Sequence, residues 1–247
     1  VNDGTSSVAY SNWKYNYSRD TNSENELGFS KFDVPHRLMA QLSYTTPKYL
    51  NGWTSTTISV IYNGFSGSRY SLTMNEVSDF NGDGQKGNSL LYIPTEAEMD
   101  NMNFVDYTDQ KTGKLIMSAA DSRKAFTEWV NNDDYAKNHR GQYAERNSNL
   151  SNWEHEIDLH LAQTIYNAQG LGKLEFTFDI INFANMLNKK WGASYSSAYN
   201  LSPLTVVSLS TDENGNRNPG YAFNNAKINK SDISSRWHAQ VGIRLTF

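Results

Sequence analysis

The segment from Trp237 to Phe247 alternates strictly between apolar and polar or small residues, and no other feature limits the fold of this chain as strongly. Its apolar set is Trp237, Ala239, Val241, Ile243, Leu245 and Phe247, and its other set is His238, Gln240, Gly242, Arg244 and Thr246. Side chains of a β-strand point to alternate faces, whereas those of a helix share a face every three or four residues. The segment therefore predicts a β-strand with one fully apolar face.

The same period of two appears in four earlier segments, which predict two hairpins. These segments are residues 37–44, 58–62, 153–166 and 173–180. The first pair is joined by a turn at Pro47 to Gly52 and the second by the Gly-containing link at Asn167 to Gly172. Short links of this kind between alternating segments are typical of antiparallel hairpins.

Charged residues recur on one face of these predicted strands. They are Arg37, Glu154, Glu156, Asp158, Glu175, Asp179 and Arg244. We interpret this face as the polar wall of a barrel lumen, on which the carboxylates pair with Arg37, Lys173 and Arg244 or contact a plug. Paired carboxylates also serve glycoside hydrolysis, but catalysis does not explain the strict period. With no nucleophile elbow or phosphate-binding glycine loop either, the chain is not expected to be an enzyme.

Three further segments alternate less regularly and bring the expected number of strands to about eight. They are Val8 to Tyr17, Tyr199 to Leu209 and Tyr221 to Ile228. Short connections are then expected at 47–52, 167–172 and 211–220, and long ones at 18–35, 75–152 and 185–198. Short turns on one side and long loops on the other are typical of outer-membrane barrels, in which the long loops are extracellular.

Composition supports strands in a membrane. Aromatic residues make up 13% of the chain, and no apolar run approaches the roughly 20 residues of a membrane-spanning helix. Any span must therefore consist of strands. A mean hydropathy of -0.67 is no objection, because every second residue of a barrel strand faces a polar lumen. With a net charge of -4 and no basic tract, the chain is not expected to bind nucleic acid.

Aromatic residues also stand near the ends of the predicted strands. They are Trp13, Tyr15, Tyr44, Trp53, Trp153, Tyr166, Trp191 and Trp237. We expect them at the membrane interfaces, where amphipathic rings are enriched. Trp129 lies in a predicted loop and is an alternative candidate for ligand contact.

No internal repeat or linker divides the chain, so residues 1–247 are predicted to form a single barrel segment. The connection from Asn75 to Asn152 is a long extracellular excursion within it. It exceeds the usual length of a structureless loop and should carry its own structure or function. Residues 119–135 are the candidate for a short helix there.

Three stretches together resemble one family. They are Phe32-Asp33-Val34-Pro35-His36-Arg37, the run from Asn81-Gly82-Asp83-Gly84 to Leu91-Tyr92-Ile93-Pro94, and the run from Asp179 to Asn188-Lys189-Lys190-Trp191-Gly192. They resemble the C-terminal barrel of TonB-dependent receptors, especially the Oar-like group of Bacteroidetes. The terminal Gly242 to Phe247 is similar to the end of outer-membrane barrels, which implies that Phe247 is the aromatic signal read by the assembly machinery.

The resemblance implies an all-β, antiparallel transmembrane β-barrel segment with long extracellular loops, in the outer membrane of a Gram-negative bacterium. A receptor of this type has about 22 strands, of which this chain would supply roughly the last third. Since it begins Val-Asn-Asp and has no counterpart of the plug, we expect a C-terminal piece of a longer protein. The implied partners are membrane lipid and lipopolysaccharide, the rest of the barrel and plug, TonB through that plug, and a surface lipoprotein.

One motif predicts a metal site. The run Asp79-Phe80-Asn81-Gly82-Asp83-Gly84 matches the start of a calcium loop, in which oxygen ligands occupy alternate positions. Position twelve of that loop is Leu90 rather than a bidentate Glu, so a complete EF-hand is excluded. A weaker calcium site formed by Asp79, Asn81, Asp83 and the Gln85 carbonyl is one interpretation, and an Asx-rich turn is the other. No other cofactor is expected.

The sequence is also compatible with two other folds and functions. A self-closed barrel of about eight strands would serve as an adhesin or membrane anchor, since eight strands leave an interior just filled by side chains. A soluble carbohydrate-binding β-sandwich would also show alternating strands and exposed aromatic residues.

Overall fold

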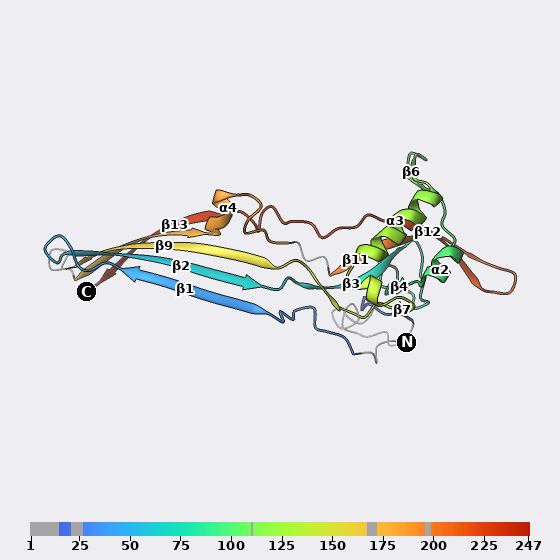
Figure 1. Cartoon of the computed structure of the whole chain (residues 1–247), viewed down its shortest axis with the longest axis horizontal. Helices are drawn as coiled ribbons and strands as arrows, with labels where there is room; N and C mark the ends of the chain where they lie inside the picture. Colours follow the sequence, from blue (N-terminus) through green and yellow to red (C-terminus); the bar gives the residue numbers. More distant parts are fainter. Residues whose placement is uncertain (1–14, 21–26, 110, 167–171, 196–198) are drawn as a thin grey trace. The chain divides into compact units, whose positions relative to one another are not determined.

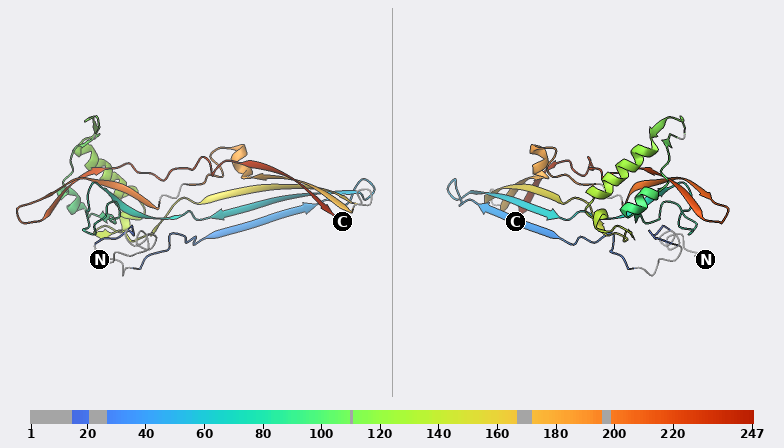
Figure 2. Two further views of the ribbon diagram at one scale, coloured as in Figure 1. Left: turned by 180° about the vertical axis from the view of Figure 1, so that it is seen from behind. Right: turned by 45° about the vertical axis from the view of Figure 1, so that its right-hand side comes forward.

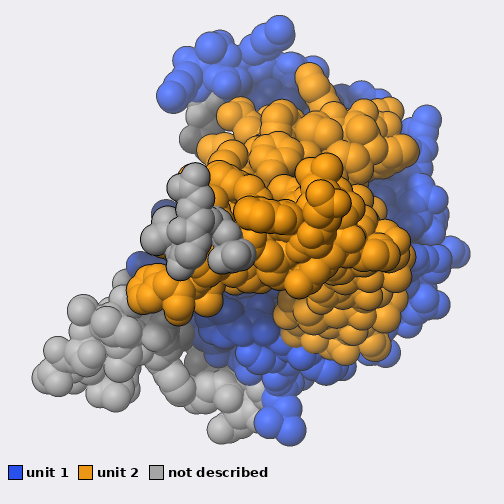
Figure 3. Space-filling view, turned by 90° about the vertical axis from the view of Figure 1, so that its left-hand side faces the viewer, with its two compact units in different colours: residues 1–33, 69–150, 198–227 blue, residues 34–68, 151–197, 228–247 orange. Residues whose placement is uncertain are grey.

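The computed structural model describes residues 15–20, 27–109, 111–166, 172–195 and 199–247 and is mostly β-sheet (Figure 1). The chain divides into two compact units. The inserted unit comprises residues 1–33, 69–150 and 198–227, and the meander unit comprises residues 34–68, 151–197 and 228–247. Figure 3 colours the inserted unit blue and the meander unit orange.

The meander unit contains one antiparallel sheet of five long strands. They are β1 (Arg37–Thr45), β2 (Thr54–Phe65), β9 (Glu154–Tyr166), β10 (Lys173–Ile181) and β13 (His238–Thr246), and they lie in the order β1-β2-β9-β10-β13. Each strand thus pairs with the next strand of the same sheet along the chain. A short helix, α4 (Phe183–Leu187), follows β10.

The connections of this sheet differ in length at its two ends. At one end of the sheet, residues 46–53 join β1 to β2, and β9 ends at Tyr166 shortly before β10 begins at Lys173 (Figure 2). In the turn at 46–53, Leu50, Asn51 and Gly52 adopt positive φ angles of 52°, 56° and 84°, a conformation that Asn and Gly tolerate better than Leu. At the other end the chain leaves the sheet after Phe65 and Ile181 and returns at Glu154 and His238.

The inserted unit is built around a four-stranded sheet. Its strands are β3 (Arg69–Glu76), β8 (Asn149–Leu150), β11 (Asn200–Thr211) and β12 (Arg217–Phe223), in the order β12-β11-β3-β8. The pairing of β11 with β3 is parallel and the others are antiparallel. Two small ribbons pair β4 (Tyr92–Ile93) with β7 (Gln142–Tyr143), and β5 (Tyr107–Thr108) with β6 (Leu115–Met117).

Helical segments of the inserted unit are α2 (Glu96–Asn101), α3 (Ala119–Asn132) and the 3-10 turn η2 (Ala136–Asn138). The predicted helix within 119–135 is confirmed. Helix α3 begins after Ser118, whose hydroxyl accepts the N–H of Asp121, as is usual for an N-cap. Its buried residues Ser122, Phe126 and Val130 recur every four positions and therefore share one face.

Most of the buried apolar side chains of the described residues lie in the inserted unit. Phe126 and Val130 are fully buried, as are Leu72 of β3 and Leu204 of β11. None of the described helices has the length and apolar character needed to cross a membrane.

The five strands predicted from strict alternation are confirmed, but the expected sheet of about eight strands is wrong for the described residues. Of the two weaker candidates, 199–209 forms most of β11, whereas 221–228 shares only Tyr221 to Phe223 with β12, and both strands belong to the other sheet. Consequently, 211–220 is not a turn of the meander. Alternation of apolar and polar residues indicates only that the two faces of a strand differ, and it does not indicate which sheet the strand joins. Most of the candidate at 8–17 lies outside the described residues.

Candidate functional site

The meander sheet has one continuous apolar face. Cross-strand pairing aligns two complete rows on it: Tyr44, Ile58, Leu161, Phe178 and Val241, and beside them Leu42, Val60, Leu159, Ile180 and Ala239. Much of this face is open, with exposed fractions of 76% for Leu42, 72% for Val241 and 70% for Ile243. Exposed apolar patches of this extent mark contact with a membrane or with another protein.

The opposite face carries all seven charged residues that the alternation predicts. Each lies an odd number of positions from the apolar residues of its own strand, so its side chain points to the other face. They are Arg37 on β1, Glu154, Glu156 and Asp158 on β9, Glu175 and Asp179 on β10, and Arg244 on β13. The sheet brings them together as one polar surface. That this surface lines a lumen stays a prediction.

Pairing on the polar face follows the prediction in part. The carboxylate of Glu175 contacts Lys173 Nζ at 3.2 Å and Arg244 Nη1 at 3.5 Å. Asp179 instead meets His160, whose Nδ1 lies 2.5 Å from the carboxylate oxygen. Arg37 donates to the amide oxygen of Asn63 at 3.0 Å rather than to a carboxylate.

Two other carboxylates of this face hold the backbone at the end of the sheet where the long connections begin. Asp158 accepts the N–H of Asn182 at 2.8 Å, directly after β10. Glu154 accepts the N–H of Tyr195 at 3.0 Å. These residues therefore fasten the departing chain as well as contributing charge.

Amphipathic rings border the apolar face at both ends. At the end with short turns, the Tyr49 hydroxyl lies 2.7 Å from Thr56 Oγ1 and donates to Gln163 at 3.1 Å. At the other end, the Trp153 ring stacks against the rings of His36 and His155, with centroids 6.3 and 6.1 Å away. Such rings present an apolar body and a polar edge.

The calcium-like loop of the inserted unit is organised by its own backbone. Asp79 Oδ1 accepts the N–H of Gly82 at 2.7 Å and of Asp83 at 3.1 Å, and its Oδ2 accepts the N–H of Gly84 at 3.0 Å. Asn81 and Asp83 accept the N–H groups two residues further on, those of Asp83 and Gln85. Within the described residues, no three His, Asp or Glu side chains are grouped as metal ligands. The geometry is that of an Asx-rich turn, and calcium binding by Asp79, Asn81, Asp83 and Gln85 stays a prediction.

Replacing Asp79 with Ala should destabilise this loop in the absence of calcium. The variant removes the acceptor of three N–H groups, and a loss of about 1 to 2 kcal/mol is expected because the loop is partly solvated. Urea unfolding of the purified chain with a chelator present measures it. Asp134→Ala is the control, since the one partner of the Asp134 carboxylate within the described residues is the exposed Lys137. If Asp79→Ala lowers the stability only when calcium is added, the carboxylate does not stabilise the loop by itself and acts as a calcium ligand instead.

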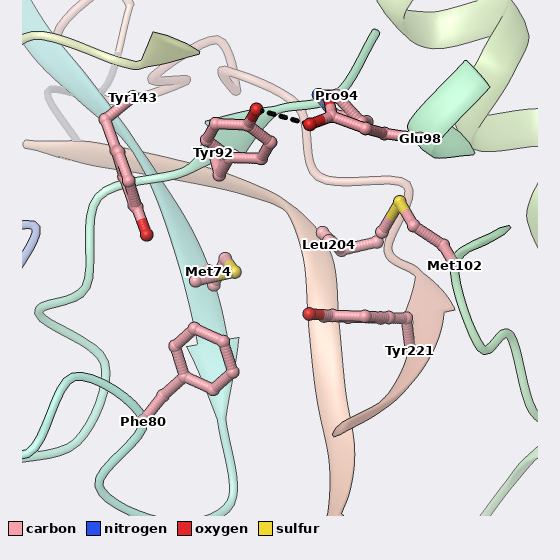
Figure 4. A pocket seen from close by; sticks show the side chains of 9 residues that line it. All are labelled: Met74, Phe80, Tyr92, Pro94, Glu98, Met102, Tyr143, Leu204 and Tyr221. Carbon is pink, nitrogen blue, oxygen red and sulfur yellow. Dashed lines mark hydrogen bonds between the residues drawn. The ribbon is translucent and has the colours of Figure 1, made fainter. Parts of the chain in front are cut away.

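A cavity of about 200 Å³ opens in the inserted unit (Figure 4). It is lined by Met74, Phe80, Tyr92, Pro94, Glu98, Met102, Tyr143, Leu204 and Tyr221. We refer to this cavity as the Glu98 pocket. Its walls come from β3, β4, β7, β11, β12, helix α2 and the loops beside them, so the whole unit must fold before the pocket exists.

Helix α2 is held at both ends, which fixes the pocket wall that it supplies. At its start, Glu98 Oε2 accepts the N–H and hydroxyl of Thr95, each at 2.9 Å, and Thr95 Oγ1 accepts the N–H of Glu98. This reciprocal pair is a capping box. At its end, the Arg123 guanidinium donates to the carbonyls of Met99, Asp100 and Met102 at 2.5 to 2.9 Å.

The pocket combines a carboxylate with neutral phenols. Glu98 also accepts the Tyr92 hydroxyl at 2.9 Å. These hydrogen bonds, first that from the Thr95 N–H, lower the pKa of Glu98, so its carboxylate is charged at neutral pH. Burial raises the pKa of Tyr221 to about 12, which keeps that hydroxyl protonated. No described Lys, Arg or His forms an ion pair with Glu98.

The sequence did not indicate this pocket. Residues 91–94 stood out only for a family resemblance, although Thr95 and Glu98 have the spacing of a capping box. Met74, Leu204 and Tyr221 come from strands far apart in the sequence, and no local pattern joins them. Trp129, the alternative candidate, stacks on Phe126 with centroids 6.0 Å apart and does not line the pocket.

Comparison of the chain with family models, with curated proteins and with solved structures gave no match.

Proposed function

We propose that this chain is the C-terminal barrel part of an outer-membrane TonB-dependent receptor, forming barrel wall and extracellular loops for nutrient uptake in a Gram-negative bacterium. The observation that carries the proposal is the meander sheet, whose exposed apolar face continues across five strands while charged residues fill its other face. A barrel wall needs these two faces, since one meets lipid and the other meets water.

The height of the apolar face supports this function. Along β9 it extends from Ile157 to Ile165, eight residue steps that span about 26 Å at the usual rise of a strand. The apolar band of an outer-membrane barrel is about 25 Å tall. Aromatic rings beyond both ends, such as Tyr49 and Trp153, match the interfacial girdles of such barrels.

The connections support the same orientation. The end of the sheet at which β1 is joined to β2 and β9 to β10 would lie on the periplasmic side, and the long connections from β2 to β9 and from β10 to β13 would be extracellular. In this function the inserted unit supplies the surface that meets cargo, which places the Glu98 pocket among extracellular loops. Phe247 follows β13 and is fully exposed, and its role as an assembly signal stays a prediction.

Two alternatives are less well supported. A self-closed barrel needs about eight strands, whereas the described sheet has five, with β1 and β13 at its edges. A soluble β-sandwich buries the apolar face of each sheet, whereas Leu42, Val241 and Ile243 are mostly exposed. Within the proposed receptor, the partners are lipid and lipopolysaccharide, the remainder of the barrel and plug, TonB, and a surface lipoprotein.

Cysteine labelling in native outer membranes tests the membrane assignment. The chain has no cysteine, so each introduced thiol reports one position. Leu42 and Val241 on the apolar face have matched controls in Gln41 and Gln240, one residue away on the polar face. A water-soluble maleimide should label cysteines at the control positions and reach those at 42 and 241 only after denaturation. Equal labelling of both faces would contradict the proposal.

Recovery of the native gene product separates a receptor from an anchor. Mass spectrometry of the outer-membrane fraction should find these residues in one polypeptide with a plug domain. A product without a plug domain would support the membrane-anchor hypothesis and contradict the receptor hypothesis, whatever the labelling shows.

A further inference from the structure

We infer that the Glu98 pocket binds an organic ammonium group on an apolar stem, as presented by a lysine side chain of a peptide. The inference rests on the proposed receptor function and adds a class of cargo group to it. It follows from the charge of the pocket, from its aromatic walls and from the hydrogen-bonding groups that its own residues leave unused.

The carboxylate of Glu98 has capacity for a ligand. An ionised carboxylate accepts about four hydrogen bonds, and Thr95 and Tyr92 supply three of them. Among the residues that the structure describes, Oε1 accepts only the Tyr92 hydroxyl, so it retains one acceptor position. Since no described cation pairs with Glu98, the pocket has a net negative charge that a bound cation would balance.

Aromatic rings surround the centre of the pocket. Figure 4 shows Phe80, Tyr92, Tyr143 and Tyr221 on different sides of Met74. Tyr92 and Tyr143 meet edge to face, with centroids 5.1 Å apart and an interplanar angle of 61°, so the two rings form a corner. Ring faces attract cations, and aromatic walls around an ammonium group are an established mode of recognition.

The remaining groups match an ammonium and its stem. The free position on Glu98 Oε1 takes one N–H donor of an ammonium, whereas the hydroxyls of Tyr143 and Tyr221 end on other sides of Met74 in Figure 4 and would meet other parts of the ligand or water. An ammonium carries three N–H donors and no acceptor. Met74 and Leu204, only 3% and 1% exposed, offer apolar surface for methylene groups. An acidic ligand would be repelled by Glu98, and a neutral alkyl group would gain no attraction from its charge.

Methyl NMR of the complete chain in detergent micelles tests this inference, with methionines labelled in their methyl groups. The probe is Nα-acetyl-lysine methylamide, and its matched control replaces the ammonium with a methyl group. The lysine probe should shift the signals of Met74 and Met102, which line the pocket, and leave those of Met39 and Met186 in place. The neutral control should bind at least tenfold more weakly.

Two variants identify the groups responsible. Glu98→Gln keeps the capping box, which Gln also forms, and should weaken the lysine probe about tenfold, equivalent to about 1.4 kcal/mol. Glu96→Gln removes a neighbouring charge that does not line the pocket and should change nothing. Tyr143→Ala should weaken binding several-fold, and Tyr143→Phe less, because the ring is retained.

Equal binding of both probes, unchanged binding by Glu98→Gln, or no shift at Met74 and Met102 would each overturn the inference. Its failure is distinct from failure of the receptor proposal. Probe binding is measured on the isolated chain, whereas labelling and mass spectrometry examine the membrane-bound product. If labelling and mass spectrometry support the receptor but the lysine probe does not bind, the receptor proposal holds and the cargo carries a different chemical group.

Discussion

Val241→Arg should prevent most molecules of the protein from reaching a stable fold in a membrane. Val241 lies in the middle of β13 on the apolar face and is 72% exposed, so the variant removes little packing. The expected loss comes from lipid, because Arg near the bilayer midplane of a barrel costs about 2 to 4 kcal/mol. The amount of folded, protease-resistant protein in the outer membrane, and urea unfolding in lipid vesicles, measure the effect.

The matched control is Gln240→Arg, one residue away on the opposite face. Gln240 pairs across the strands with Asp179, so an Arg there meets a carboxylate and should be tolerated. A sheet whose apolar face met water would accept Arg at either position. Equal tolerance would therefore count against membrane residence, while equal damage would indicate that β13 tolerates no bulky residue on either face.

The sheet faces were predictable because they depend on adjacent residues. Once a segment such as 237–247 is a strand, the direction of every side chain follows from its position, and the apolar set fixes the register of its partners. The same reasoning predicts that the carboxylates of the polar face pair with Lys173 and Arg244, and Glu175 contacts both. Arg37 departs from this prediction because its guanidinium donates to Asn63, a residue of β2 that lies opposite Met39.

The inserted unit was not predictable in this way. Its strand β11 pairs in parallel with β3, and the two are separated by more than a hundred residues of chain. Nothing in a local period of two distinguishes such a strand from one of the meander. The helix at 119–132 could be predicted, because its cap and its buried face are local features. The Glu98 pocket could not, because its walls depend on those long-range pairings.

The two units also differ in what stabilises them. The inserted unit buries Leu72, Phe126 and Leu204, a core of the usual kind. The meander sheet buries few large apolar side chains, so the hydrophobic effect in water contributes little to its fold. We therefore expect its stability to depend on lipid or detergent, whereas the inserted unit should depend on its own packing.

Arg69 is the clearest single anchor of the inserted unit. Its side chain is only 8% exposed, and Nε donates to Asp33 at 2.7 Å. Nη1 donates to the carbonyl of Asn147 at 3.2 Å, and the guanidinium lies 3.9 Å from the centre of the Phe29 ring. This one side chain joins β3 to two segments that are distant in sequence. Asp33 lies in residues 32–37, one of the three stretches that carry the family resemblance. Its ion pair with Arg69 gives a physical reason for an acidic residue at position 33.

Arg69→Met should destabilise the inserted unit by about 3 kcal/mol, because it leaves Asp33 and the Asn147 carbonyl without their donor. The value lies at the low end for a broken buried pair, since Asp33 is 38% exposed and water replaces part of the loss. Asp33→Ala should cost a similar amount by leaving the guanidinium without a counter-charge. The double variant should cost clearly less than the sum, because both single variants break the same contact. Urea unfolding of the whole chain in detergent, followed by proteolysis of the inserted unit, measures all three, with the exposed Arg37→Met as control. Additive losses would mean that Arg69 acts through Phe29 and Asn147 alone, and that Asp33 is not its partner.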